Sequence, residues 1–452
     1  MTTPPIRGLR WVILGFLSLA GAQAWAWSNH TLAAYRALEK MPEVASAAPV
    51  PVEPLEAFLR AEEKTIEALL ASQEAWAAGN LEKYPTLPAA LVFKADSSRS
   101  DEARRQAFLR ALRAAPNFKF ALFVQPDPHA AVSGPPLAAS AVSTLPVHAN
   151  ATQRFVALKA GELVAPLAVA ASASDEPDYG LDINIWEDSP SEWGPSYGLG
   201  PLPFGNPALP YATQAPFHMG FYHESRILYM AAPFIKRTFP LLRAHQFSTL
   251  GSLALRTGHP YWGWRFAGMA LHYVQDMTQP YHASLSPGDS VPKLLGANIL
   301  AMMGMERTKN DMIVLLSNRH LALEKYQNEL LAQAAAARQD TRLEKSLRNG
   351  EHDASYPAWS DTYLRDVVAR QSATAGPQLV ETLLASMPAG FVSDPGYDFG
   401  VNEGSVQLTR ELAARSPEDR ARLENAIAEL LGNFGAHSRN AVRGILRAGN
   451  PQ

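Results

Sequence analysis

The sequence predicts a mainly α-helical protein, with a multi-helix core and a partly irregular insertion in the N-terminal half. Apolar residues recur at three- and four-residue spacing over residues 55–78, 242–257, 261–279 and 310–337, which is typical of helices with an apolar face. Residues 126–174 are instead rich in Ala, Pro and Val and poor in charge, which indicates extended chain and loops. Hydrophobic residues make up 47% of the 452 residues, enough for one large core or for two ordinary domains.

The N-terminus carries the features of a secretory signal peptide, which we expect to span residues 1–26. Arg7 and Arg10 supply its positive end, an apolar run follows, and the small-x-small sequence AWA at 24–26 predicts the cleavage site. The apolar run is short for a membrane span. We therefore expect a mature chain, residues 27–452, that is secreted or periplasmic.

The remaining elements are expected in the following order. An insertion of helices and irregular chain occupies residues 31–170, a long helical region follows it, and C-terminal helices fill residues 376–452. The pattern predicts helices at 31–48, 55–78, 101–115, 217–238, 242–257, 261–279, 310–337 and 417–431, a strand at 118–126, and a loop at 198–216.

Charge and cysteine content exclude several classes of protein. Without the two arginines of the signal peptide, 38 basic residues face 43 acidic ones, a net charge of −5. This balance argues against a polyanion binder with a broad basic face, so nucleic acid is not an expected partner. Cysteine is absent, which excludes disulfides, thiolate metal sites and thiol nucleophiles. A transition metal would have to be bound by His, Asp, Glu and backbone groups.

One short stretch, HYVQDMTQPYHAS at residues 272–284, places three possible metal ligands close together. His272 and Asp276 are four residues apart in a predicted helix, so their side chains point to the same face. Pro280 is expected to end or kink that helix, and His282 lies just beyond it. Spacing alone also allows a hydrogen-bonded surface pair and a histidine that caps the helix.

A second pair with the same spacing, His320 and Glu324, follows in the predicted helix 310–337. Nitrogen and carboxylate ligands that converge from helical faces suit divalent ions such as zinc. Signal cleavage would also make Trp27 the first residue, in the sequence WSNH. Its free α-amino nitrogen and its carbonyl oxygen can chelate a metal ion, and His30 is near enough to complete the site.

A mature chain that begins with Trp and continues with H-Y-x-x-D-x-x-Q-P-x-H and H-x-x-x-E resembles the zinc-dependent phospholipase C family of bacteria. That family shares a superfamily with zinc-dependent single-strand nucleases. The resemblance covers residues 27–30 and about 178–324 but not most of 31–170. It implies three zinc ions in an α-helical cleft, with Asp276 as a bridge between two of them. The implied ligand sets are an upstream Asp and His with His272 and Asp276 for the first ion, His282, His320 and Glu324 for the second, and Trp27, His30 and Asp276 for the third.

The upstream Asp and His each have two candidates. EPDYGLD offers Asp178 and Asp182, and the resemblance favours Asp178 because a Tyr follows it. FHMGFYHE offers His218 and His223, of which we favour His218. Our hypothesis is that Asp178 also orients or deprotonates the attacking water. The chain departs from the family in the short spacing from Trp27 to His30 and in the long gap between His282 and His320.

Three features favour a phospholipid substrate over nucleic acid. The last ligand pair ends in Glu324, where the nucleases have Asp, and Thr278 stands where they usually carry His. A nuclease-like W-A-D segment is also absent from the sequence. We therefore expect a phospholipase C that hydrolyses glycerophospholipids such as phosphatidylcholine. A single-strand nuclease and a non-catalytic, metal-stabilised binding protein are the alternatives.

A phospholipase must reach its substrate at a membrane surface, so we expect transient peripheral contact with lipid. The apolar segment LLGANILAMMGM at 294–305 lies in the long gap between two expected ligands. Our hypothesis is that this segment forms the rim of the cleft and enters lipid, with help from Trp262 and Trp264. The alternative is a buried helix that fills the core.

Overall fold

The computed structural model describes residues 29–128, 130, 134–145, 154–205 and 210–450. Helices hold 63% of the residues and strands 3%, so the prediction of a mainly α fold is confirmed. The expected signal peptide, residues 1–26, and the expected ligand Trp27 lie outside the described residues.

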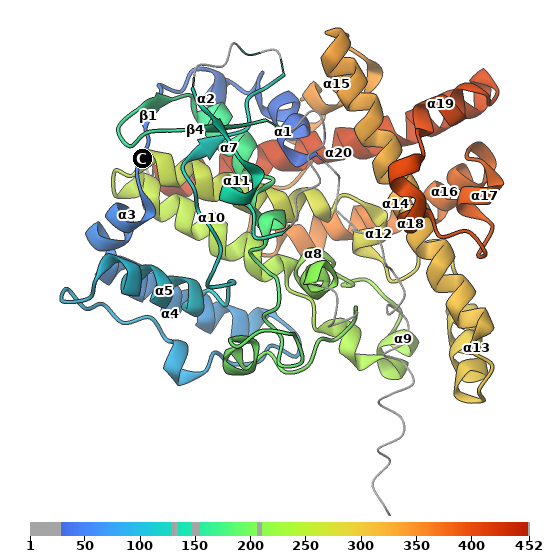
Figure 1. Ribbon diagram of the computed structural model, residues 1–452, viewed down its shortest axis with the longest axis horizontal. Helices are drawn as coiled ribbons and strands as arrows, with labels where there is room; N and C mark the ends of the chain where they lie inside the picture. Colours follow the sequence, from blue (N-terminus) through green and yellow to red (C-terminus); the bar gives the residue numbers. More distant parts are fainter. Residues whose placement is uncertain (1–28, 129, 131–133, 146–153, 206–209, 451–452) are drawn as a thin grey trace, which may run out of the picture.

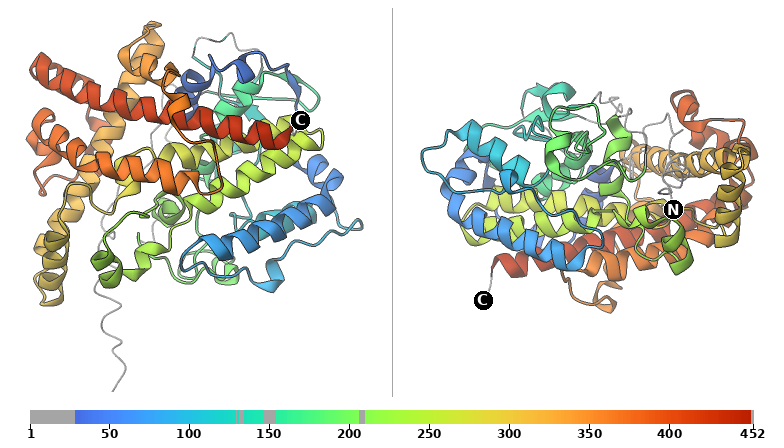
Figure 2. Two further views of the ribbon diagram at one scale, coloured as in Figure 1. Left: turned by 180° about the vertical axis from the view of Figure 1, so that it is seen from behind. Right: turned by 90° about the horizontal axis from the view of Figure 1, so that it is seen from below.

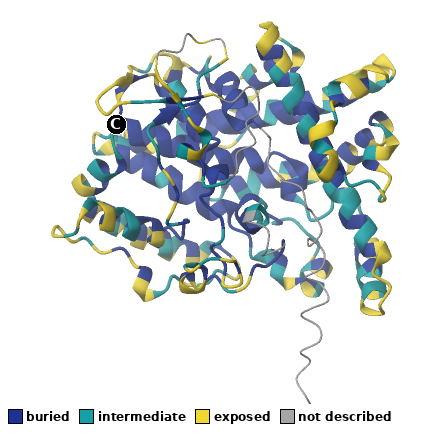
Figure 3. Cartoon of the chain, viewed as in Figure 1, coloured by how far each residue is buried: buried dark blue, intermediate teal, exposed yellow. Residues whose placement is uncertain are grey.

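A helical hairpin forms the centre of the fold (Figure 1). Its members, α10 (Pro240–Arg256) and α11 (Pro260–Asp276), are joined by a short turn at Gly258, and each has a proline in its first turn, where no backbone donor is lost. Residues 261–276 of α11 are all buried, because other helices cover this helix on every side. Around the hairpin lie α1 (His30–Leu38), α7 (Pro166–Ala173) and α20 (Pro417–Gly449). The buried residues in Figure 3 concentrate in this central group.

The contact between α7 and α11 depends on a glycine. A Cβ atom added at Gly268 of α11 would lie 2.3 Å from the carbonyl oxygen of Ala170 and 2.6 Å from the Cβ of Ala173. The two helices therefore approach closely only because Gly268 has no side chain. This approach places the chain segment after α7 next to the C-terminal half of α11.

Smaller elements surround this centre (Figure 2). Two small antiparallel sheets in the N-terminal half pair β1 (Val50–Pro51) with β5 (Leu163–Val164), and place β4 (Phe155–Ala157) between β2 (Phe123–Val124) and β3 (Pro136–Leu137). The N-terminal half also contains α2 (Pro42–Ala45), α3 (Leu55–Ala61), α4 (Glu63–Asn80), α5 (Asp101–Ala111) and α6 (Ala139–Val142). The remaining helices are α8 (Ala215–His218), α9 (Arg226–Ala231), α12 (Pro280–Ala283), α13 (Val291–Met302), α14 (Arg307–Ala337), α15 (Arg342–Arg348), α16 (Arg370–Ser386), α17 (Ala389–Val392), α18 (Phe399–Asn402) and α19 (Leu408–Ala413).

Several predicted elements are wrong in extent. The single helix expected at 217–238 is divided into α8, α9 and a 3₁₀ turn. The helix is interrupted because the N–H of Gly220 donates to the carbonyl oxygen of His282, at 2.8 Å, and not to a carbonyl of the preceding turn. The helix expected at 31–48 is interrupted between α1 and α2, where Pro42 begins a new helix. Only Phe123 and Val124 of the strand expected at 118–126 pair in a sheet.

The aromatic part of the lipid-contact hypothesis is also wrong. Trp262 and Trp264 are 0% and 5% exposed, because the helix that carries them is surrounded by the core. The segment 294–305 forms most of α13 and the turn after it, and it is neither wholly buried nor wholly exposed. Leu294 and Ala297 are buried, while its outer side chains are exposed. Among the described residues, no helix is both long and apolar enough to cross a membrane.

Candidate metal centre

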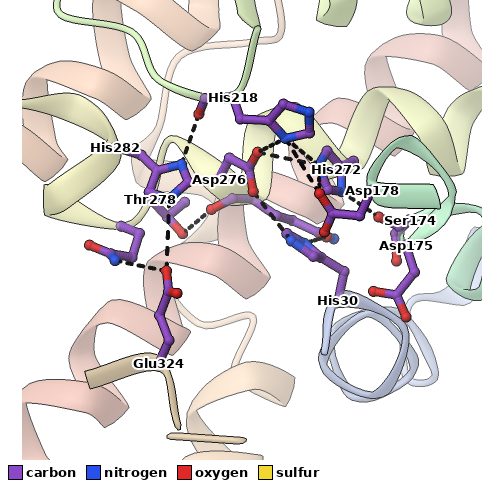
Figure 4. Close-up of polar contacts among 12 residues, drawn as sticks. His30, Ser174, Asp175, Asp178, His218, His272, Asp276, Thr278, His282 and Glu324 are labelled. Atoms are coloured by element: carbon purple, nitrogen blue, oxygen red, sulfur yellow. Dashed lines mark hydrogen bonds and ion pairs between the residues drawn. The ribbon is translucent and has the colours of Figure 1, made fainter. Parts of the chain in front are cut away.

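Three groups of buried side chains converge where α1, α8, α11, α12 and α14 meet (Figure 4). In each group, at least one imidazole nitrogen and one carboxylate oxygen lie within 4.8 Å of each other, close enough to bind one metal ion. The groups are His30, His272 and Asp276; Asp178, His218 and His272; and His282, His320 and Glu324. All of their members are buried, so the groups lie inside the protein rather than on its surface.

Asp276, at the end of α11, lies between two of these groups. Its Oδ1 is 3.2 Å from Nε2 of His30, which begins α1. Its Oδ2 is 3.0 Å from Nδ1 of His218 and 3.3 Å from Nε2 of His272. The two oxygens of one carboxylate therefore face different sets of imidazoles, which is the arrangement of a carboxylate that can bridge two cations.

His218 and His272 meet Asp178 on the Oδ2 side of Asp276. Nε2 of His272 is 2.9 Å from Nδ1 of His218. Oδ1 of Asp178 is 3.7 Å from that Nδ1 and 3.6 Å from that Nε2. Since two nitrogens and carboxylate oxygens surround one point, this group can supply several ligands to one ion.

The third group joins α12 to α14. Nε2 of His282 is 3.2 Å from Nε2 of His320, and Oε1 of Glu324 is 2.7 Å from the latter. The side chain of Gln279 caps α12 by accepting a hydrogen bond from the backbone, and its amide donates to the same Oε1 at 3.0 Å. The turn between α11 and α12 thus directs His282 toward His320 and Glu324 of α14.

The second ring nitrogen of each of three histidines has an acceptor that fixes the orientation of the ring. Nδ1 of His272 lies 2.7 Å from the carbonyl oxygen of Ser174, and Nδ1 of His282 lies 2.8 Å from that of His218. Nδ1 of His30 lies 2.8 Å from Oε1 of Gln275. A proton held at Nδ1 leaves Nε2 as the nitrogen that faces the cluster, which is the usual orientation of a metal-ligating histidine. The sequence patterns did not identify Ser174 and Gln275 as supporting residues.

The structure distinguishes the acidic residues of DEPDYGLD. Glu176 accepts two 2.8 Å hydrogen bonds from Arg265, and Asp182 accepts hydrogen bonds from Arg243 and Tyr273. Asp175 is bound by Thr31 and Gln125. Oδ1 of Asp178 accepts no hydrogen bond and is directed at the histidines of the cluster.

Asp182 and His223, the alternative candidates for the upstream ligands, have other partners. Asp182 lies 3.6 Å from Nε2 of His218, so it is placed behind that imidazole and orients its Nδ1 toward the centre. His223 is half-buried, and its Nε2 donates to the carbonyl oxygen of Arg365 at 2.7 Å, away from the three groups. The structure thus brings Asp178 and His218 into the cluster and leaves Asp182 and His223 outside it.

Electrostatics in the cluster favours the ionised form of Asp276. Burial opposes the charge on Asp276, but the positive field and hydrogen bonds of its histidine neighbours lower its pKa well below the usual range. Burial also lowers the pKa of His30, yet the hydrogen bond and charge of Asp276 outweigh this effect and raise it to about 9. The same negative field attracts a divalent cation, which would displace the imidazole proton. Burial lowers the pKa of His282 to about 3, so its free nitrogen is an available ligand.

Two buried carboxylate oxygens of the three groups lack a hydrogen-bond partner, which favours a cation at these positions. Nε2 of His30 and Oδ1 of Asp276 face each other at 3.2 Å, whereas Oδ1 of Asp178 and Oε2 of Glu324 are buried without a hydrogen-bond partner. Each such atom costs about 1–3 kcal/mol unless something binds it. The convergence of nitrogen and carboxylate donors without thiolate fits a divalent ion such as zinc. The three clusters could hold metal ions.

Comparison of the chain with protein-family models, with curated proteins and with solved structures finds no match. The chemistry of the site must therefore be inferred from the residues and from their geometry.

Proposed function

We propose that the chain is a zinc-dependent phospholipase C, which hydrolyses glycerophospholipids such as phosphatidylcholine to diacylglycerol and a phosphorylated head group. The observation that carries the proposal is the position of Asp276, with Oδ1 3.2 Å from His30 and Oδ2 3.0 Å from His218. Adjacent metal ions are a common feature of enzymes that hydrolyse phosphodiesters. The sequence motifs support the phospholipase branch of this chemistry.

The proposed ligand sets follow the three groups. When bound, the ions would polarise the phosphoryl oxygens and lower the pKa of a bound water. The proposed ligands are Asp178, His218, His272 and Asp276 for one ion, His282, His320 and Glu324 for a second, and Trp27, His30 and Asp276 for a third.

Asp178 is the proposed base. Its Oδ1 is buried and accepts no hydrogen bond, so it can accept the proton of the attacking water. Burial raises the pKa of Asp178, which makes the carboxylate a stronger base than an exposed aspartate. The water oxygen forms the new bond to phosphorus, the bond from phosphorus to the glycerol oxygen breaks, and that oxygen leaves as an alcohol after it takes up a proton.

The N-terminal chelate and an extracytoplasmic location belong to the same proposal. Cleavage after residue 26 would free the α-amino nitrogen of Trp27 as a ligand, which the peptide nitrogen of the precursor cannot be. A variant with one additional residue before Trp27 should bind about one zinc ion fewer than the mature chain. Equal zinc content in the two proteins would contradict the N-terminal chelate.

The test combines metal content with three substrates. The chain starting at Trp27 is purified, its zinc is measured, and phosphatidylcholine, phosphatidylglycerol and single-stranded DNA are assayed side by side. We expect about three zinc ions and hydrolysis of phospholipid. Activity on DNA alone would assign the centre to a nuclease, and full zinc content without any hydrolysis would indicate a metal-stabilised binding protein.

Two variants from one short stretch provide a matched control. His218→Gln should lower the zinc content and abolish hydrolysis, because His218 faces Asp276. His223→Gln, only five residues away and bonded to a backbone carbonyl, should leave both unchanged. Equal effects of the two substitutions would refute the assignment of His218 as a ligand.

A further inference from the structure

Two neighbouring surface elements carry most of the exposed large apolar side chains of the described residues. Six of the ten such side chains lie on α9, on α13 and in the turn after α13, while the other four are scattered. We call these six the α9–α13 face: Ile227 and Met230, with 54% and 76% exposure, and Ile299, Met302, Met303 and Met305, with 58%, 51%, 68% and 49%. The two helices contact each other, and both lie at the lower end of Figure 1.

The α13 helix is apolar on both of its sides. Leu294 and Ala297 pack with Leu228, Met312 and Ile313 in a hydrophobic cluster separate from the main core. This inner contact holds the helix in place, and the outer apolar side chains are not part of the cluster. A surface helix normally presents polar residues to water, and an apolar outer face beside an apolar inner one indicates a second apolar environment.

The charged residues on α9 and α13 themselves are basic, while the acidic residues near the α9–α13 face lie outside these two helices. Residues 226–236 and 291–305 contain Arg226, Lys236 and Lys293 but no acidic residue, although the whole chain has a net charge of −3. Lys236 and Lys293 form ion pairs with Glu82 and Asp289, and exposed Glu306 follows Met305, so exposed Arg226 is the cation that this face offers to a phosphate. Exposed apolar side chains beside an exposed cation fit the interface of a phospholipid bilayer, where phosphate groups lie next to hydrocarbon.

We propose that the α9–α13 face inserts into the surface of a phospholipid bilayer, an inference that rests on the proposed function and names the contact through which the enzyme reaches its substrate. In the sequence, the helix α13 follows α12, which carries His282, and precedes α14, which carries His320. From Arg307 to His320 the axis of α14 extends for about 20 Å at about 1.5 Å per residue. The long gap between these two histidines thus forms the lipid contact and connects it directly to the third cluster.

Vesicle binding tests the face independently of hydrolysis. All proteins in this measurement carry Asp178→Asn, so that the vesicles stay intact, and sedimentation with equimolar phosphatidylcholine and phosphatidylglycerol vesicles gives the binding constant. Met302→Ser with Met303→Ser should weaken binding by about tenfold or more, since two exposed apolar side chains lose their lipid contact. The matched control, Leu163→Ser with Val401→Ser, removes side chains of 67% and 71% exposure from elsewhere and should not change binding.

A soluble substrate separates failure of this inference from failure of the proposed function. With Asp178 intact, the Met302→Ser, Met303→Ser protein should hydrolyse a water-soluble phosphodiester, p-nitrophenyl phosphorylcholine, at the wild-type rate. If the wild-type chain hydrolyses neither this compound nor phospholipid, the proposed function fails, while the vesicle measurement still decides the lipid contact. Unchanged vesicle binding by the methionine variant would overturn the inference. A change from dimer to monomer in the variant with vesicle binding unaltered would also overturn it and assign the face to a second copy of the chain.

Discussion

The close packing of α7 on α11 makes Gly268→Ala a quantitative test of how the centre is held. The new Cβ would lie 2.3 Å from the carbonyl oxygen of Ala170, whereas carbon atoms in contact lie about 3.5–4.0 Å apart. Alanine favours a helix over glycine by about 0.8–1.0 kcal/mol, but overpacking costs about 1–3 kcal/mol. Since the obstructing atom belongs to a backbone that cannot change rotamer, we expect the upper part of that range. The free energy of unfolding should fall by about 1–2 kcal/mol.

Gly268→Ala should also lower the amount of zinc that the candidate metal centre binds. The helix α7 ends just before Ser174, whose carbonyl oxygen accepts the 2.7 Å hydrogen bond of His272, so a shift of α7 moves this acceptor. Denaturant unfolding and bound zinc are measured together. The control is Gly296→Ala in α13, where an added Cβ would have no atom within 4 Å. This substitution should raise the free energy of unfolding by up to about 1 kcal/mol. A Gly268→Ala protein as stable and as rich in zinc as the wild type would refute the reasoning.

Three further outcomes are expected. Burial lowers the pKa of His437 to about 3 from its usual 6.5, so the unfolded chain binds one proton more within that window and stability rises with pH by about 1.4 kcal/mol per unit. His437→Gln should therefore flatten the dependence of unfolding free energy on pH between about 4 and 6, and an unchanged slope would contradict this. Arg243→Met leaves the carboxylate of Asp182 buried without its cation and should lower the unfolding free energy by about 3–5 kcal/mol in denaturant titrations, whereas a loss under about 1 kcal/mol would disprove the role of the pair. Zinc at a hundredfold excess over its dissociation constant should stabilise the chain by about 3 kcal/mol per site over the chelated protein, so equal melting temperatures with and without chelator would rule out metal-linked folding.

Helical spacing accounts for the part of the site that the sequence predicted. His272 with Asp276, and His320 with Glu324, lie four residues apart within the long helices α11 and α14. In a regular helix this spacing alone places both side chains on one face, so no tertiary information is required. Pro280 likewise ends the first helix by a local effect.

Long-range contacts account for the part that the sequence could not predict. The region 217–238 has the composition of a helix, but a hydrogen bond from Gly220 to His282, distant in the chain, holds it in another conformation. Trp262 and Trp264 are amphipathic residues that suit a lipid interface or a core equally well. Only the packing of α11 among its neighbours decides that both are buried.

The choice among the acidic residues near Asp178 shows where sequence information ends. Local spacing cannot decide between these carboxylates, because the partners that neutralise two of them lie far along the chain. Arg243 is 61 residues from Asp182, and Arg265 is 89 residues from Glu176. Both arginines come from the central hairpin, whose second helix, α11, also carries His272 and Asp276. The hairpin therefore holds the chain on both sides of Asp178, through Glu176 and Asp182. Because those two carboxylates are bound by arginines, Asp178 is the one of the three that can bind a cation.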